Sequence, residues 1–289
     1  MGLRAKFNLV ILAASAVGFV IAAVVLNRVL IDNAREQVLQ NARIMMTAAN
    51  AVRKYTEQEL GPLLPMERDG KFVPQSVPAY AAQTNFKDVQ AAFAGYTYRE
   101  AALNPTNLSD RAQDWEADII GLFRNEPVRQ ELVAERDTPI GPTLNLARPI
   151  SIDEAACLSC HSMPSAAPAA LTATYGTVNG FGWKLHETVG AQILSVPMAV
   201  PLKLAHDAYF TFLVIMVAIF AIVFGILNLL LHYLVIVPVK RVSATADAIS
   251  LGEENVEPYI KPGKDEISSL SASFNRMRES LKRAMAMIK

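Results

Sequence analysis

The chain has 289 residues and is electrically balanced, with 27 acidic and 27 basic side chains. This balance leaves no basic surface of the kind that nucleic-acid binding needs, so we expect no nucleic-acid partner. Apolar residues make up 52% of the sequence, largely because of two long apolar runs, which indicates a membrane protein.

The first apolar run covers residues 9–26 and follows Arg4 and Lys6. Its length is about the minimum for a helix that spans a bilayer. A cleaved signal peptide has the same basic start and apolar core, but residues 24–31 lack the small residues of a cleavage site. The sequence therefore predicts an uncleaved transmembrane anchor over residues 1–32, in preference to a signal peptide.

Residues 33–208 are long enough to form one domain with its own core. A helical stripe of apolar residues predicts that a helix continues from residue 32 to about residue 60, where Gly61 and Pro62 end it. Residues 72–83 contain prolines and are expected to be extended. Residues 86–93 fit either a helix or a strand.

The rest of this domain is expected to mix helix and strand. Strands are predicted over residues 96–102, 144–152 and 189–197. An amphipathic helix is predicted over residues 110–123, with a continuation over residues 127–134 after a break. Periodicity alone predicts the α+β class, and the order of these elements further suggests a PAS-like sheet.

The stretch from Cys157 to His161 has the spacing C-x-x-C-H, which is the attachment signal for c-type haem. Cys157 and Cys160 would bind the haem vinyl groups as thioethers, and His161 would be the proximal ligand of the iron. Because these are the only cysteines in the chain, we predict one covalent haem c per chain. A thioredoxin-like motif needs a long helix after it, and a zinc site needs further ligands at suitable spacing; the sequence offers neither.

The second apolar run covers residues 209–237 and precedes Lys240 and Arg241. Positive charge marks the cytoplasmic end of a membrane span, so both termini are expected in the cytoplasm and residues 33–208 in the periplasm. This predicts a two-pass protein of the bacterial inner membrane. Haem is attached to C-x-x-C-H on the periplasmic side, which agrees with this topology.

Residues 238–289 carry two helical patterns joined by a connector. Apolar residues of the second pattern recur at steps of three and four, as in a coiled-coil seam: Ile267, Leu270, Phe274, Met277, Leu281, Ala284 and Ile288. Because the chain ends at Lys289, no globular domain is available to cover this seam. We therefore expect a second copy of the chain to cover it.

This segment resembles a HAMP domain, in its Pro238 after the membrane span, its connector with Gly252, and the pair Asp265 and Glu266 that opens the second helix. HAMP domains are parallel four-helix coiled coils made by two chains, and they pass changes in helix packing to an output module. The resemblance implies a homodimer and a separate cytoplasmic signalling partner. Ser268 stands where the family often has glycine.

The preceding segment, from residue 33 to about residue 198, resembles the Tll0287-like domain, formerly DUF3365. The similar stretches are residues 51–56 with Pro62, residues 98–107, 114–116, 157–161, 180–183, 189–191 and 196–198. The resemblance implies a PAS-like fold with one c-type haem, often in membrane sensors. In a soluble member of the family, a cysteine on the N-terminal helix is the second iron ligand, and this chain has no cysteine to spare.

The second iron ligand therefore has three alternatives. Met45 and Met46 lie on the corresponding helix and are candidate metal ligands, although for either residue alone core packing is the safer interpretation. His186 follows the glycine- and aromatic-rich turn and is a second candidate. The third alternative is an open position that binds a diatomic gas.

Three further residues of the similar stretches are candidates for binding the haem. Arg53, Tyr55 and Arg99 are proposed to contact the propionates, because arginine forms paired hydrogen bonds with carboxylates. Ordinary ion pairing is the alternative reading of each arginine.

Two functions fit these features. One is a membrane-bound c-type haem sensor of redox state or gas, which signals through the HAMP-like segment. The other is a membrane-anchored c-type cytochrome for electron transfer. Residues 238–289 favour the sensor, because an electron carrier does not need them. The sequence shows no convincing distal acid–base pair of a peroxidase, so we expect no enzymatic activity.

Overall fold

The structure is a computed structural model that describes residues 2–253 and 256–288. The chain divides into two compact units: Arg28–Ala208 form one, and Met1–Asn27 with Tyr209–Lys289 form the other. Two helical stretches, Leu3–Leu60 and Ala199–Ser250, are long and apolar enough to cross a membrane. Both predicted apolar runs thus lie within helices.

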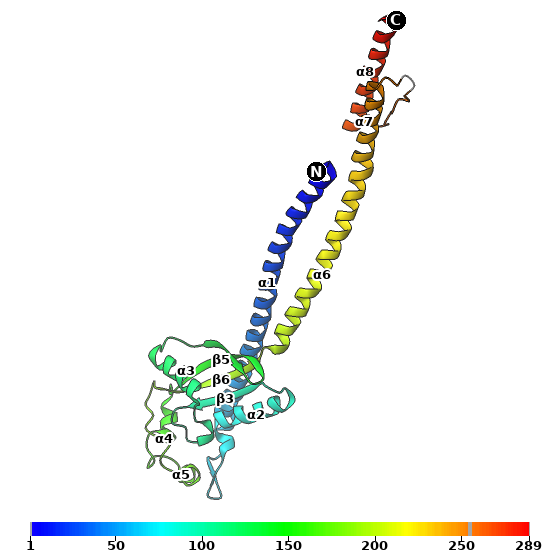
Figure 1. Cartoon of the computed structure of the whole chain (residues 1–289). Coiled ribbons are helices and arrows are strands. Elements are labelled where there is room, and N and C mark those ends of the chain that lie inside the picture. The colour runs from blue at the N-terminus through cyan, green and yellow to red at the C-terminus, as the bar shows by residue number, and fades with distance from the viewer. Residues whose placement is uncertain (1, 254–255, 289) are drawn as a thin grey trace. The chain divides into compact units, whose positions relative to one another are not determined.

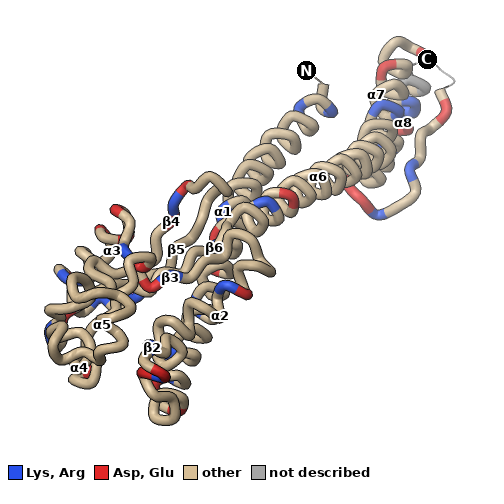
Figure 2. Tube along the Cα trace, turned by 90° about the horizontal axis from the view of Figure 1, so that it is seen from below, with Lys and Arg blue, Asp and Glu red and all other residues tan. Residues whose placement is uncertain are grey.

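The charged residues gather outside the apolar runs. Figure 2 shows them in the sheet-containing unit and around α7 (Val237–Ser250) and α8 (Glu266–Ile288). The apolar runs between these regions carry few charges, as membrane-spanning helices require.

The unit Arg28–Ala208 is built on a four-stranded antiparallel sheet (Figure 1). Its strands are β3 (Thr97–Ala102), β4 (Leu132–Thr138), β5 (Gly141–Ser151) and β6 (Thr188–Pro197), in the order β3-β6-β5-β4. A short hairpin of β1 (Glu67–Arg68) and β2 (Lys71–Phe72) precedes it. The class is α+β, as predicted.

Helices cover both faces of this sheet. The end of α1 (Leu3–Tyr55) and α2 (Pro78–Ala92) contribute Met46, Ala49 and Phe86 to one core, which meets Leu146 and Leu194 of the strands. Helix α3 (Asp114–Asn125) packs on the other face. Because side chains alternate along a strand, β3, β5 and β6 each supply residues to both cores.

Three ion pairs connect residues 35–53 of α1 to the sheet and to the segment just before β4. Arg35 pairs with Glu135 at 3.1 Å, and Arg43 pairs with Glu131 at 3.0 Å. Arg53 pairs with Glu100, near the end of the helix. A π-helical turn, Thr56–Leu60, then ends this long helix before the β1–β2 hairpin.

Most of the predicted elements are confirmed. The predicted strands over residues 96–102, 144–152 and 189–197 are β3, β5 and β6, and the predicted helix with Trp115 is α3. The prediction that residues 72–83 are extended was wrong in its second half, because α2 begins at Pro78. Proline fits the first turn of a helix, where its missing N–H has no intrahelical partner.

The predicted continuation of α3 over residues 127–134 was also wrong. Leu132 begins β4, which pairs with β5 along its whole length. As an edge strand it carries exposed charged residues, such as Glu135 and Asp137, so an apolar alternation is weak in its sequence.

In the other unit, α7 and α8 are joined by a connector that contacts α8. Ser271 donates a hydrogen bond to the Tyr259 carbonyl at 2.6 Å, and Arg278 donates to the Val256 carbonyl at 2.9 Å. Asp265 accepts hydrogen bonds from the amide and hydroxyl of Ser268 and so caps α8.

The predicted seam of α8 is partly exposed in the single chain. Leu270, Met277 and Leu281 have about half or more of their surface open, with exposed fractions of 48%, 60% and 49%. The side chain of Ile288, the last predicted seam residue, lies outside the described residues.

Candidate haem-binding site

The C-x-x-C-H stretch forms a single compact turn between β5 and β6. A 3-10 turn, Ala155–Cys157, leads into the short helix α4 (Leu158–His161). Cys157 and Cys160 are free, half-buried thiols, and their spacing of three places them on one side of this turn. Burial raises the pKa of the Cys157 thiol, and the nearby Glu57 and Glu154 charges add to this.

The His161 ring is held on two sides. Its plane stacks on Trp183, with ring centroids 4.0 Å apart and an interplanar angle of 14°. Its Nδ1 lies 2.7 Å from the Gly180 carbonyl oxygen, so Nδ1–H is the donor and Nε2 keeps its lone pair. Burial lowers the pKa of His161, although the bond to Gly180 acts in the opposite direction. A neutral imidazole with a free Nε2 is the form that ligates a metal.

The loop that carries Gly180 is itself fixed to the turn. Gly182 donates a backbone hydrogen bond to Ser162, and Trp183 donates one to His161. Gly180 has a φ of +82°, and a Cβ atom there would lie 2.1 Å from the Thr106 hydroxyl oxygen. Only glycine fits this position without a shift of the backbone.

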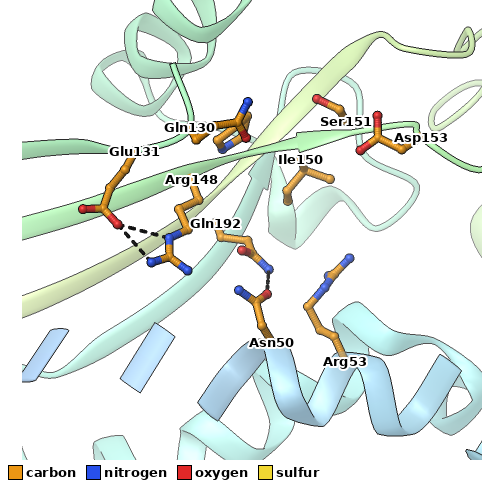
Figure 3. A pocket seen from close by; sticks show the side chains of 10 residues that line it. Asn50, Arg53, Gln130, Glu131, Arg148, Ile150, Ser151, Asp153 and Gln192 are labelled. Atoms are coloured by element: carbon orange, nitrogen blue, oxygen red, sulfur yellow. Dashed lines mark hydrogen bonds and ion pairs between the residues drawn. The ribbon is translucent and has the colours of Figure 1, made fainter. Parts of the chain in front are cut away.

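A cavity of about 490 Å³ lies between α1 and the sheet, close in sequence to the same turn (Figure 3). Asn50 and Arg53 project into it from α1, opposite Arg148 on β5 and Gln192 on β6. Asp153, four residues before Cys157, also lines it. The cavity is therefore adjacent in the chain to the two thiols.

On the face of the sheet that α1 covers, neighbouring residues of β3, β6 and β5 form rows across the strands, and the size and polarity of the side chains differ from one row to the next. Tyr98, Leu194 and Leu146 form a large, mostly apolar row. The next row is polar, with Glu100, Gln192 and Arg148 side by side. The row after it consists of Ala102, Gly190 and Ile150, the first two of which are small. The tight packing of α1 on the sheet thus gives way to a polar and more open region at the end nearest the C-x-x-C-H turn.

The three candidate propionate contacts lie in different places. Arg53 lines the cavity and pairs with the buried Glu100, which also accepts a hydrogen bond from Tyr98 at 2.8 Å. Arg99 lies on the α3 face of the sheet, where its Nε is 3.2 Å from Glu116. Tyr55 is 57% exposed and lines a second cavity, beside α2. Of the three, only Arg53 lines this cavity, and the propionate contacts stay predictions.

The candidates for the second iron ligand also lie apart. Met46 is completely buried in the core between α1, α2 and the sheet, and Met45 packs against the same core. His186 is exposed, has a left-handed backbone with a φ of +62°, and lies 4.0 Å from Asp153. These positions favour core packing for the methionines, and the second ligand stays a prediction.

Sequence reasoning missed the cavity residues Asn50, Arg148 and Gln192. A signal was present, because Arg148 and Gln192 are large polar residues inside strands that are predicted to be buried. Among the residues that the structure describes, no group of three or more His, Cys, Asp or Glu side chains is arranged to hold a metal ion directly.

Comparison with protein-family models matches residues 31–197 to the Tll0287-like family, described as Tll0287, and residues 230–283 to the HAMP domain. Among solved structures, the crystal structure of the cyanobacterial heme-protein Tll0287 is similar, at 16% identity and a TM-score of 0.44. That match covers 56% of this chain and 95% of the other. A comparison with curated proteins finds no match.

The HAMP match indicates a role in signal transduction. The Tll0287-like match spans more than half of the sequence. The chain therefore belongs to the Tll0287-like family, with its family domain between two apolar helices and a HAMP domain after the second.

Proposed function

We propose that this protein is a membrane-bound c-type haem sensor that passes a periplasmic redox or gas signal through its HAMP domain to a separate cytoplasmic partner. The observation that carries the proposal is the state of His161. Its Nδ1–H is committed to Gly180 while Nε2 is free, next to two free thiols on the same turn. This is the donor set that a covalently attached haem requires.

The haem, when bound, supplies the electron-transfer and gas-binding chemistry of its iron. The protein attaches it through Cys157 and Cys160, one haem per chain, and provides His161 Nε2 as the proximal ligand. Trp183 fixes the plane of the imidazole by stacking on it. Arg53, in the adjacent cavity, offers a guanidinium to a propionate.

The connection from this site toward the HAMP domain is short in sequence. Strand β6 begins at Thr188, directly after the loop that holds His161, and ends at Pro197. Helix α6 (Ala199–Leu230) follows after one residue. Strand β6 thus joins the loop at the proposed haem site directly to the second apolar helix. A structural change at the haem could be transmitted along this strand, which supports a signalling role.

The remaining features of the proposal follow from the sequence. Residues 1–32 and 209–237 are the two membrane spans, residues 33–208 are the PAS-like periplasmic haem domain, and residues 238–289 are the cytoplasmic HAMP domain. The positive charges outside each span set this orientation in the inner membrane. The exposed seam of α8 is covered by a second chain, which makes the protein a homodimer.

A membrane-anchored cytochrome is the second candidate, favoured by the half-buried position of both thiols, which would place the attachment point of the haem near the surface of the domain. Neither function involves an enzymatic reaction at the haem.

The test uses the full chain, expressed together with the cytochrome c maturation machinery. Optical spectra of the oxidised and reduced protein, with and without CO or NO, should show a c-type haem. Replacing both Cys157 and Cys160 by Ser should abolish the pigment that survives acid extraction. A covalent pigment in that double variant, or its absence from the wild type, would refute the site.

A second experiment separates sensor from electron carrier. Leu270→Cys, on the seam of α8, should form a cross-link between chains in membranes, at a rate that changes when the haem is reduced or binds gas. Ala272→Cys, on the side of the same helix that faces away from the seam, is the matched control. A cross-linking rate that is independent of haem state would support the cytochrome.

A further inference from the structure

We propose that Asn104 is a positioning residue for the iron ligand. Its side chain holds the Gly180–Phe181 peptide so that the Gly180 carbonyl accepts the hydrogen bond from His161 Nδ1. The inference rests on the haem site proposed above, and it adds a residue from a distant part of the sequence to that site.

The contact between Asn104 and the loop is reciprocal. The Gly180 amide donates to Asn104 Oδ1 at 3.2 Å, and Asn104 Nδ2 donates to the Phe181 carbonyl at 3.3 Å. A primary amide carries both an acceptor and donors, so it can satisfy an N–H and a C=O of consecutive residues at once. The side chain therefore fixes the orientation of the loop backbone at two points.

The sheet anchors Asn104 itself. Strand β3 ends at Ala102, and the Leu103 amide donates a backbone hydrogen bond to Val189 on β6. Thr106, two residues after Asn104, contacts the α-carbon side of Gly180 and lies 3.4 Å from His161 Nδ1 through its hydroxyl oxygen. The segment after β3 thus contacts Gly180 and is itself hydrogen-bonded to β6. The position of this segment on the sheet therefore determines the direction of the Gly180 carbonyl.

The carbonyl in turn determines the rotation of the His161 ring. Stacking on Trp183 fixes the plane of the ring but still allows a half-turn about the Cβ–Cγ bond, which exchanges the positions of Nδ1 and Cδ2. The 2.7 Å hydrogen bond to Gly180 removes this freedom and fixes the tautomer. A strong bond to Nδ1–H also raises the basicity of Nε2, which stabilises ferric more than ferrous iron. Loss of Asn104 should weaken this bond and raise the reduction potential.

The expected size follows from the usual effect of such partners. Removing a hydrogen-bonding partner of a metal-ligating histidine changes metal affinity by about 10- to 100-fold. If the affinity for ferric iron falls tenfold while the affinity for ferrous iron stays the same, the one-electron reduction potential rises by about 59 mV.

The experiment compares Asn104→Ala with Asn107→Ala in the full-length, haem-loaded protein. Asn107 is a matched control from the same loop, because its side chain accepts a hydrogen bond from the Ser109 amide instead of contacting residues 180 and 181. We would measure covalent haem content, the reduction potential by optical titration, and the EPR g values of the ferric form.

Asn104→Ala should keep its covalent haem, raise the potential by about 59 mV or more and shift the g values, while Asn107→Ala should match the wild type. Unchanged potential and g values in Asn104→Ala, or an equal shift in Asn107→Ala, would overturn the inference.

A second variant covers the case in which Asn104→Ala does not accumulate. Asn104→Leu has nearly the same shape and no charge, but it lacks both the acceptor for the Gly180 amide and the donor to Phe181. It should raise the potential in the same direction, and a wild-type potential in this variant would overturn the inference. Absence of covalent haem from the wild type would overturn the proposed function as a whole, whereas a missing potential shift in haem-loaded variants overturns only the role of Asn104.

Discussion

Replacing Arg53 by Met should destabilise the sheet-containing unit strongly, because it leaves Glu100 as an unpaired buried charge. The Glu100 side chain is 4% exposed, whereas the Arg53 side chain is 26% exposed. Breaking a buried ion pair by removing one partner costs about 3–5 kcal/mol. Since Arg53 reaches solvent in part, we place the loss of unfolding free energy near the lower end, at about 3 kcal/mol.

Arg35→Met is the matched control on the same helix. Arg35 also pairs with a glutamate of the sheet, but its side chain and that of Glu135 are 49% and 42% exposed. Exposed pairs contribute about 0–1 kcal/mol, so this variant should remain close to the wild type.

The assay is denaturant unfolding of the full chain in detergent, followed by tryptophan fluorescence. The two tryptophans, Trp115 and Trp183, both belong to the sheet-containing unit, so the signal reports on this unit. The measurement uses the Cys157→Ser/Cys160→Ser background, so that a bound haem contributes neither stability nor quenching.

A double variant, Arg53→Met/Glu100→Gln, completes the test. Replacing both partners removes the unpaired charge, and the amide oxygen of the new glutamine side chain can still accept a hydrogen bond from Tyr98. Most of the lost stability should therefore return. If Arg53→Met costs no more than Arg35→Met, or if the double variant is as unstable as Arg53→Met, the reasoning about the buried charge is wrong.

Three further outcomes are expected. Gly180→Ala should lower covalent haem content, measured by haem staining, because its Cβ would clash with Thr106; normal loading would contradict this. Burial raises the pKa of Glu131, but the ion pairs with Arg148 and Arg43 outweigh it, so the pKa is lowered overall. Ionised Glu131 should therefore stabilise the fold above about pH 4.3, and this stabilisation is lost as the pH falls further. Denaturant unfolding at several pH values should show that Glu131→Gln removes this pH-dependent loss, which is at most about 1 kcal/mol. Truncation after Pro238 should leave haem attachment intact and weaken dimerisation in cross-linking; loss of haem from a correctly inserted truncation would refute the modular organisation.

Elements with a clear run or a periodic pattern of apolar residues were predictable from the sequence. The strands β5 and β6 are apolar along much of their length because both of their faces are buried, and the helix α3 shows an amphipathic period because one of its sides is buried. Edge strand β4 was not predictable in this way, because its burial comes from pairing with β5 and most of its side chains face solvent.

The candidate site was predictable only where its residues are neighbours in sequence. The spacing of Cys157, Cys160 and His161 is local, so it is visible without a fold. The contact of Asn104 with Gly180 joins residues 76 positions apart, and no short pattern encodes it.

The difference between Arg53 and Arg99 has a related cause. Arg99 and Glu100 are adjacent on β3, so their side chains point to opposite faces of the sheet. The sequence alone does not say which of the two faces α1 covers. The fold places Glu100 toward α1 and Arg53, and Arg99 toward α3 and Glu116.

The three arginines of α1 have a mechanical consequence. They are eight and ten residues apart, which is about 12 Å and 15 Å along the helix axis, and each has its own acidic partner. A slide or a screw rotation of α1 by a single residue would misplace all three guanidinium groups together. Sliding of this helix over the sheet therefore requires the buried pair of Arg53 to break and the two more exposed pairs to rearrange with it, so the end of the helix and the sheet should move together as one body.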